Sequence, residues 1–252
     1  NDEKKPDEIF FEAVFENRAV KAAVTKEAEA MLGKEAIFAS NTSSLPITEL
    51  AEASKRPANF IGMHFFSPAE KMPLVEIICG KKTSKEALAK AFDLGILLGK
   101  KPIVVNDAPG FFTTRVIGAT ITEGAQMVIE GINPALIDSA AAFNGSPVGP
   151  LGALDEISLE TAYKNGKQGH EDAKARGEKI TDNATFTLVE TMCTKFDRKG
   201  KAYGGGICEY REGGKKFSWP GLRIHYAKKG YKDIAFEDIK DRLVFSQVIE
   251  AV

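Results

Sequence analysis

The sequence has few of the residues that build metal centres and disulfide frameworks. It contains three cysteines and three histidines, which are Cys79, Cys193, Cys208, His64, His170 and His225. The cysteines form no CxxC pattern, which predicts reduced thiols in a cytosolic protein, and the scattered histidines argue against a histidine-built metal site. No apolar run approaches the ~20 residues that a membrane-spanning helix needs, so no spanning segment is predicted.

The chain also lacks an excess of charge of either sign. Its 34 basic and 35 acidic residues give a formal net charge of −1. Such a balance gives no indication of a nucleic-acid or membrane-surface partner. What is present is ordinary for a globular protein: 252 residues, 43% of them hydrophobic and 27% charged. This length is enough for one large or two smaller domains with real cores.

Two apolar, β-favouring runs at 60–67 and 72–78 flank a short polar turn and predict a hairpin. Position 70 in that turn lies midway between His64 and Glu76, so pairing of the runs places these two residues opposite each other. Directly opposed residues have Cβ atoms about 4.5–5.5 Å apart, which allows a side-chain hydrogen bond. A glutamate that orients a histidine makes a general base. The alternative is that His64 is a core histidine with its hydrogen bonds satisfied.

Hydrophobic periodicity predicts alternating strands and helices in the first part of the chain. Strands are expected at 9–15, 36–40 and 102–106, helices at 18–32, 47–54 and 85–98, and the hairpin at 60–78. Ser84 is the expected N-cap of the helix at 85–98, and Gly99 is expected to close it. This order predicts an α/β domain with a mostly parallel sheet over residues 1–106.

The second part of the chain carries helical rather than strand spacing. Helices are expected at 111–130, 134–142, 154–176, 184–196 and 235–252, the second of them capped by Asn133. No strand-period segment occurs between 110 and 195, so an all-helical domain is predicted. The basic, glycine-rich stretch 197–214 could cradle phosphates, although lone glycine clusters are more often flexible surface turns.

Several motifs in this order and spacing resemble those of the L-3-hydroxyacyl-CoA dehydrogenases. They are 11–17 (FEAVFEN), 41–45 (NTSSL), 62–68 (GMHFFSP), 74–77 (LVEI), 107–111 (DAPGF), 147–150 (PVGP) and the loop 198–206. The likeness is strongest to the dehydrogenase part of the multifunctional β-oxidation α subunits, which also carry an enoyl-CoA hydratase. It implies an incomplete Rossmann-type NAD-binding domain at 1–106, a helical dehydrogenase domain at 107–230, and the start of a second helical domain at 231–252.

The resemblance implies roles for three catalytic residues. His64 matches the general base that removes the proton of the substrate 3-hydroxyl while the hydride passes to NAD, and Glu76 matches the glutamate that polarises it. Ser43 matches a serine that hydrogen-bonds the substrate oxygen. The alternative for Ser43 and Ser44 is that they cap the helix that follows, and with two serines one could serve each role.

The resemblance also implies the residues that contact cofactor and substrate. The cofactor residues are expected to be Ala13, Glu16, Lys21, Asn41 and Ser67. For Lys21 the alternative is a solvated charge on a helix. Thr114 takes the position at which many family members have a substrate-binding asparagine, and its hydroxyl can replace only part of an amide's hydrogen bonding.

The family's GxGxxG turn, which binds the pyrophosphate of NAD at a helix N-terminus, is absent from these 252 residues. We therefore expect a fragment, shortened at both ends, that binds NAD poorly. The resemblance implies an acyl-CoA substrate and a homodimer or a complex with a thiolase subunit. It also implies a cytoplasmic location, or the mitochondrial or peroxisomal matrix in a eukaryote.

Two other interpretations stay open. The chain could be a non-catalytic assembly or dimerisation module of a larger β-oxidation complex. It could also belong to another class of hydroxyacid dehydrogenase that uses a lysine base. That class would have a lysine in place of the His64–Glu76 pair.

Overall fold

The computed structural model describes residues 9–175, 177, 179, 183–211, 213–214, 216–227 and 234–252. The chain divides into two compact units, residues 1–115 and 116–252. The boundary falls inside helix α4 (Thr113–Ile129). The expected boundary near residue 230 lies outside the described residues.

The first unit is built on a five-stranded sheet in the order β1-β2-β3-β4-β5. Its strands are β1 (Ile9–Glu12), β2 (Ile37–Ser40), β3 (Phe60–Phe65), β4 (Leu74–Ile78) and β5 (Lys101–Val105). Only the β3–β4 pair is antiparallel, and the other three pairs are parallel. The prediction of a mostly parallel α/β sheet is therefore confirmed.

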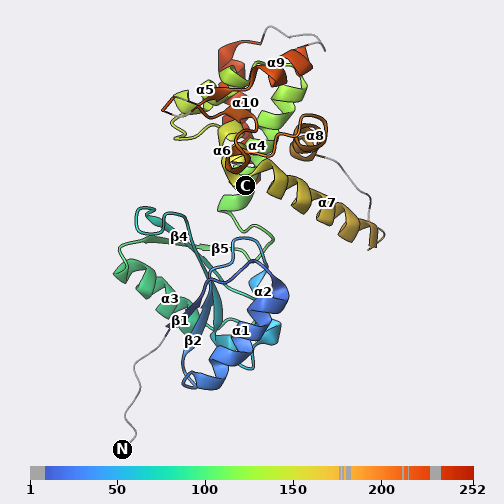
Figure 1. Cartoon of the computed structure of the whole chain (residues 1–252). Coiled ribbons are helices and arrows are strands. Elements are labelled where there is room, and N and C mark those ends of the chain that lie inside the picture. Colours follow the sequence, from blue (N-terminus) through green and yellow to red (C-terminus); the bar gives the residue numbers. More distant parts are fainter. Residues whose placement is uncertain are drawn as a thin grey trace, which may run out of the picture. The chain divides into compact units, whose positions relative to one another are not determined.

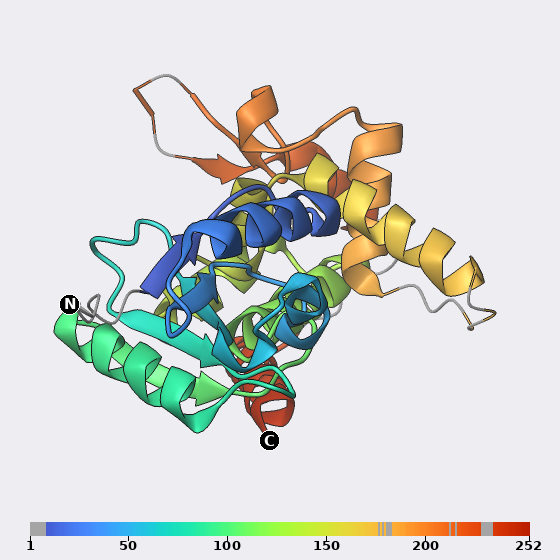
Figure 2. The same ribbon diagram turned by 90° about the horizontal axis from the view of Figure 1, so that it is seen from below.

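Helices cover both faces of this sheet, as expected when parallel strands are buried on two sides. They are α1 (Arg18–Met31), α2 (Ile47–Leu50) with a 3₁₀ turn at Ala51–Ala53, a 3₁₀ turn at Pro57–Asn59, and α3 (Lys85–Leu97). Figures 1 and 2 show α3 on the face opposite α1. Ala28, Ile47 and Phe60 belong to the core under α1 and α2, whereas Ile61 and Ala91 belong to the core under α3.

The antiparallel pair β3–β4 has the predicted register, with His64 directly opposite Glu76. Two residues further back, Gly62 lies against helix α2. A Cβ at this position would lie 2.7 Å from Cδ1 of Ile47, so only glycine allows the strand and the helix to approach this closely.

The first strand is shorter than predicted. The expected strand ran from 9 to 15, but β1 ends at Glu12, because the Glu12 carboxylate accepts a hydrogen bond of 2.6 Å from the backbone N–H of Val14 and turns the chain. Helix α1 then begins after Asn17, whose side-chain oxygen accepts hydrogen bonds from the N–H groups of Ala19 and Val20.

The second unit is mainly helical around one apolar core. After α4 its elements are α5 (Pro134–Phe143), α6 (Pro150–Ile157), α7 (Leu159–Ala175), α8 (Ala184–Glu190), a π-helical turn (Thr191–Lys195), a 3₁₀ turn (Lys201–Tyr203), β6 (Cys208–Glu209), β7 (Phe217–Ser218), α9 (Pro220–Ala227) and α10 (Phe236–Ala251). In the part of the chain that the structure describes, no helix has the length and apolar character needed to cross a membrane.

The prediction of one helix over 154–176 is wrong. Two helices, α6 and α7, meet at Ser158, which has a left-handed φ of 87°. This break allows the N–H of Glu160 to bond the carbonyl oxygen of Lys199 at 3.2 Å. The sequence has no glycine or proline there, so the interruption depends on a partner some 40 residues away.

Side-chain hydrogen bonds join the described part of the glycine-rich stretch 197–214 to itself and to helix α6. The buried carboxylate of Asp155 accepts hydrogen bonds from the N–H groups of Ile207 (2.7 Å) and Cys208 (3.2 Å). Arg198 donates to the carbonyl oxygens of Gly206 (2.6 Å) and Cys208 (3.1 Å). The guanidinium group is thus bound within its own loop, which argues against a phosphate cradle.

Candidate active site

Several of the expected site residues lie at the carboxyl ends of the parallel strands. Because β1, β2 and β3 are parallel, their carboxyl ends meet at one edge of the sheet, where α/β proteins bind their ligands. Ala13 follows β1, Asn41 follows β2, and Ser67 lies two residues beyond β3. His64 is the penultimate residue of β3.

His64 and Glu76 form a buried hydrogen-bonded pair, with Nδ1 of His64 2.7 Å from Oε2 of Glu76. The other oxygen of Glu76 accepts a bond of 2.7 Å from the N–H of Thr113. Burial acts to raise the pKa of Glu76, but the hydrogen bonds from His64 and Thr113 outweigh it and hold the pKa below its ordinary value. Glu76 is therefore a carboxylate at neutral pH.

A carboxylate on Nδ1 fixes the proton of the imidazole ring. Nδ1 carries the hydrogen and donates it to Glu76, which leaves a lone pair on Nε2 of His64. No group among the described residues hydrogen-bonds Nε2. The ring packs against Phe66, with centroids 4.5 Å apart, and against Phe111 at 6.0 Å. One ring nitrogen of His64 is thus oriented by Glu76, and the other has no hydrogen-bond partner among the described residues.

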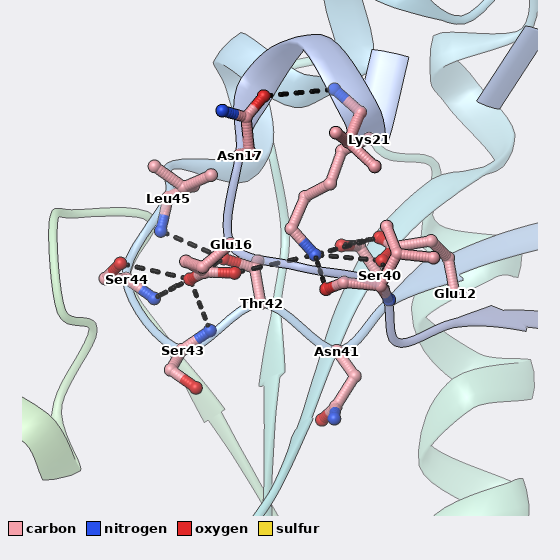
Figure 3. A network of polar contacts seen from close by, with 12 residues as sticks. Glu12, Glu16, Asn17, Lys21, Ser40, Asn41, Thr42, Ser43, Ser44 and Leu45 are labelled. Atoms are coloured by element: carbon pink, nitrogen blue, oxygen red, sulfur yellow. Dashed lines mark hydrogen bonds and ion pairs between the residues drawn. The ribbon is translucent and has the colours of Figure 1, made fainter. Parts of the chain in front are cut away.

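Glu16 holds the loop between β2 and α2 (Figure 3). Its Oε1 atom accepts hydrogen bonds from the hydroxyl of Thr42 (2.7 Å), the N–H of Ser43 (2.9 Å), and the N–H and hydroxyl of Ser44 (3.0 Å each). Burial acts to raise the pKa of Glu16, but the hydrogen bonds from Thr42 and Ser44 prevail and lower it. This carboxylate therefore anchors the backbone that carries Ser43.

The two serines do not cap helix α2. The N-terminus of α2 is capped by Asp107, which accepts from the N–H groups of Ile47 (2.7 Å) and Thr48 (2.8 Å). Ser44 donates its hydroxyl to Glu16, whereas Ser43 is exposed and its hydroxyl points away from Glu16 (Figure 3). The capping alternative is therefore wrong, and the hydroxyl of Ser43 is left available for a ligand.

Lys21 is not a solvated helix charge, as one alternative held. The residue is 2% exposed, and its Nζ lies 2.9 Å and 3.2 Å from the two carboxylate oxygens of Glu12 and 3.5 Å from Oε2 of Glu16. Glu12 also accepts a bond of 2.7 Å from the hydroxyl of Ser40. Glu12 was not among the site residues expected from the sequence. The available signal was an acidic residue at the end of a buried strand, nine positions before a lysine.

No hydrogen bond joins the remaining expected residues to one another in the described part of the chain. Asn41 accepts a bond of 2.8 Å from the N–H of Phe65, which ties the end of β2 to the end of β3. Ala13, Ser67 and Thr114 are exposed. Thr114 follows Thr113, the residue whose N–H binds Glu76.

Two family models together match most of the first 210 residues of this chain. Residues 3–108 match the NAD-binding domain of 3-hydroxyacyl-CoA dehydrogenase, and residues 110–210 match the C-terminal domain of the same enzyme. The chain belongs to the 3-hydroxyacyl-CoA dehydrogenase family.

Relatives from bacteria agree with this membership. Over 251 residues the chain is 39% identical to a fatty acid oxidation complex subunit alpha of Shewanella baltica, a match of 98% of this chain and 34% of that protein. The chain spans about a third of the length of the curated relatives that it matches. A crystal structure of the (S)-3-hydroxybutyryl-CoA dehydrogenase PaaH1 from Ralstonia eutropha is similar with a TM-score of 0.70 and 35% identity, over 81% of this chain and 71% of that one.

A third similarity shows the fold alone. The dehydrogenase part of multifunctional enzyme 1 from C. elegans has a TM-score of 0.66 at 23% identity, over 97% of this chain and 55% of that one. Together the matches confirm the fold class expected from the sequence, a Rossmann-like sheet followed by a helical dehydrogenase domain.

NAD is the cofactor of this family, and the residues at the sheet edge fit its nicotinamide half. Ala13, Ser43 and Ser67 are small and exposed, so a ligand can approach the backbone there. The ionised carboxylate of Glu16 and the amide of Asn41 are polar groups that can hydrogen-bond a ribose. A pyrophosphate-binding GxGxxG turn does not occur in the 252 residues.

Proposed function

We propose that this chain carries the acid–base chemistry of an NAD-dependent dehydrogenase that oxidises L-3-hydroxyacyl-CoA to 3-oxoacyl-CoA in fatty-acid β-oxidation. The observation that carries the proposal is the buried 2.7 Å hydrogen bond between His64 and Glu76 at the carboxyl edge of an NAD-binding sheet.

In this proposal His64 is the general base and Glu76 orients it. Nε2 of His64 accepts the proton of the substrate 3-hydroxyl, and the C3–O bond becomes a carbonyl. The resulting imidazolium is stabilised by Glu76, which stays ionised because its pKa is lowered. Bound NAD supplies the acceptor for the hydride that leaves C3.

Other residues at the edge position the reactants. Ser43, with its exposed hydroxyl and a backbone fixed by Glu16, is proposed to hydrogen-bond the substrate oxygen. Thr114 is proposed to contact the acyl-CoA beside His64 and Glu76. Ala13, Glu16, Lys21, Asn41 and Ser67 are proposed to lie next to the nicotinamide and its ribose.

The 252-residue polypeptide by itself is proposed to bind NAD weakly, because it contains no GxGxxG turn. The measurement is a titration with NADH, followed by fluorescence, of this polypeptide and of the natural protein that contains it. Equal affinity of the two would contradict this part of the proposal.

The test of the base is His64→Gln in the natural protein that contains this chain. With acetoacetyl-CoA and NADH as substrates, kcat should fall by about 10²–10⁴, the usual contribution of a positioned general base. A matched control is His170→Gln, in helix α7 of the second unit, which should leave kcat within about twofold. A wild-type rate for His64→Gln would refute the proposal.

A second candidate function, assembly, is favoured by the surface of helix α10. Phe245, Val248 and Ile249 are 56%, 48% and 76% exposed on this helix. Such an apolar stripe is typical of contact surfaces, and relatives are named as subunits of a complex. We propose contact with a second copy or with a thiolase subunit. Ile249→Glu should reduce the particle mass measured by light scattering, while Glu250→Gln should not.

A further inference from the structure

The buried ion pair Glu12–Lys21 lies at the carboxyl ends of β1 and β2, next to the candidate site. Glu12 ends β1 and is 2% exposed, and Lys21 in α1 is equally buried. The Glu12 carboxylate accepts hydrogen bonds from the N–H of Val14 at 2.6 Å and from the hydroxyl of Ser40 at 2.7 Å. One carboxylate thereby joins the end of β1, the end of β2 and helix α1.

The ammonium group of Lys21 is fully engaged in this arrangement. A lysine has three N–H donors and no acceptor. Its Nζ lies 2.9 Å and 3.2 Å from the oxygens of Glu12 and 3.4 Å from the carbonyl oxygen of Val14. A fourth contact, 3.5 Å to Oε2 of Glu16, brings the ammonium group next to the candidate site, so Lys21 also acts on the site through its neighbours.

Glu16 is the neighbour that connects this pair to the site. Its Oε2 atom lies 3.5 Å from Nζ of Lys21, and its Oε1 atom binds the N–H groups of Ser43 and Ser44 at 2.9 Å and 3.0 Å. Figure 3 shows this continuous path of polar contacts from Glu12 through Lys21 and Glu16 to the loop at residues 42–44. The charge of Lys21 attracts one oxygen of Glu16, and the loop binds the other.

We infer that Glu12 and Lys21 are positioning residues, which hold Glu16 and, through it, the backbone of Ser43 and Ser44 in the geometry that receives the nicotinamide end of NAD. This inference rests on the proposed function. It gives Lys21 a positioning role in addition to the cofactor contact that the resemblance implies, and it gives Glu12 a positioning role as well.

The physical argument for positioning rather than stability comes from desolvation. The free energy lost when two charges are removed from water is about as large as the free energy gained from their attraction. Replacing a whole buried pair with uncharged residues is therefore often neutral or stabilising. Removing one partner alone leaves an uncompensated buried charge and is strongly destabilising. A double substitution therefore separates the two roles, because it removes the pair without leaving a lone charge.

The experiment compares Glu12→Gln, Lys21→Met and the double variant in the natural protein that contains this chain. The readout without cofactor is hydrogen–deuterium exchange of the peptide that carries the Ser43 and Ser44 amides. We expect the double variant to keep the wild-type Tm within a few degrees but to lose about tenfold in the protection of these amides, as is typical when a charge-assisted bond is lost. The KM for NADH should rise about tenfold, with the KM for acetoacetyl-CoA changed less.

A matched control is the exposed ion pair Arg18–Glu49, which joins the same helix α1 to α2 at 2.9 Å with side chains 63% and 50% exposed. The variant Arg18→Gln/Glu49→Gln should leave amide protection and the KM for NADH unchanged. Wild-type protection in the double variant Glu12→Gln/Lys21→Met would overturn the inference.

Ser40→Ala keeps the test decisive even if the ion-pair variants unfold. It removes one hydrogen bond to Glu12 and leaves both charges in place. Protection of the Ser43 and Ser44 amides should fall about two- to fivefold, in keeping with one hydrogen bond, and no change would contradict the inference. A failure of the proposed function would give a different result, namely a wild-type kcat for His64→Gln. The hydrogen–deuterium exchange measurement does not depend on catalysis, so the two failures can be told apart.

Discussion

His64 and Glu76 face each other as a directly opposed pair of the antiparallel strands β3 and β4, with Nδ1 and Oε2 2.7 Å apart. The second oxygen of Glu76 is bound by the N–H of Thr113, at the first residue of α4. Glu76 therefore connects His64 to the backbone on which Thr114 lies. The register of β3 and β4 places His64 opposite Glu76, and this pairing fixes the orientation of the imidazole.

The first prediction concerns this carboxylate. Glu76→Gln keeps the size of the side chain but removes the charge that stabilises the imidazolium, so kcat should fall by about 10²–10⁴. Steady-state reduction of acetoacetyl-CoA measures it. Glu86→Gln, at an exposed position of α3, is the control and should have no effect. An unchanged kcat for Glu76→Gln would remove Glu76 from the mechanism.

The second prediction concerns stability against pH. The pKa of Glu76 is lower in the folded protein than its ordinary value of 4.5. A depressed carboxyl pKa contributes stability that is fully present above the ordinary value and is lost as pH falls through the folded-state pKa. The difference in unfolding free energy between wild type and Glu76→Gln should therefore be constant above about pH 5.5 and shrink below about pH 4.5. Urea unfolding at a series of pH values measures it, and a difference independent of pH would contradict the shift.

The third prediction concerns Asp107, which caps α2 from about 60 positions further along the chain. Asp107→Ala should lower the free energy of unfolding by about 1–2 kcal/mol, as is typical for the loss of an N-cap. Asp93→Ala, on the exposed surface of α3, should change it by less than about 0.5 kcal/mol. Equal free energies of unfolding for Asp107→Ala and Asp93→Ala in chemical denaturation would show that the cap does not stabilise the protein.

The fourth prediction concerns two glycines of the second unit. A Cβ at Gly206 would collide with the carboxylate of Asp155, so Gly206→Ala should destabilise by about 1–3 kcal/mol. Gly169 lies in the interior of α7 with no atom within 4 Å of a Cβ, so Gly169→Ala should stabilise by about 0.5–1 kcal/mol. Thermal unfolding followed by circular dichroism tests both. A Gly206→Ala variant as stable as wild type would show that the loop at 198–206 is not tightly packed, and a lower Tm for Gly169→Ala would contradict the second expectation.

Features set by neighbours along the chain could be predicted from the sequence. Ser84 accepts a bond of 3.1 Å from the N–H of Ala87, and Asn133 accepts one of 3.1 Å from Ala135, so both predicted caps are confirmed. The pairing of His64 with Glu76 followed from equal distances to the centre of a turn. In each case the partners lie within about a dozen residues, where periodicity and spacing determine geometry.

Features set by distant partners were decided by the tertiary structure. Buried Lys21 has its partner in Glu12, which also binds Ser40 at the end of β2, and the cap of α2 comes from Asp107. The break at Ser158 depends on the carbonyl of Lys199. The position of a charged residue or a hydroxyl in the sequence does not show which buried group it will hydrogen-bond. That choice is made only when strands and helices pack, because a buried polar group must find its partner among whatever residues then surround it.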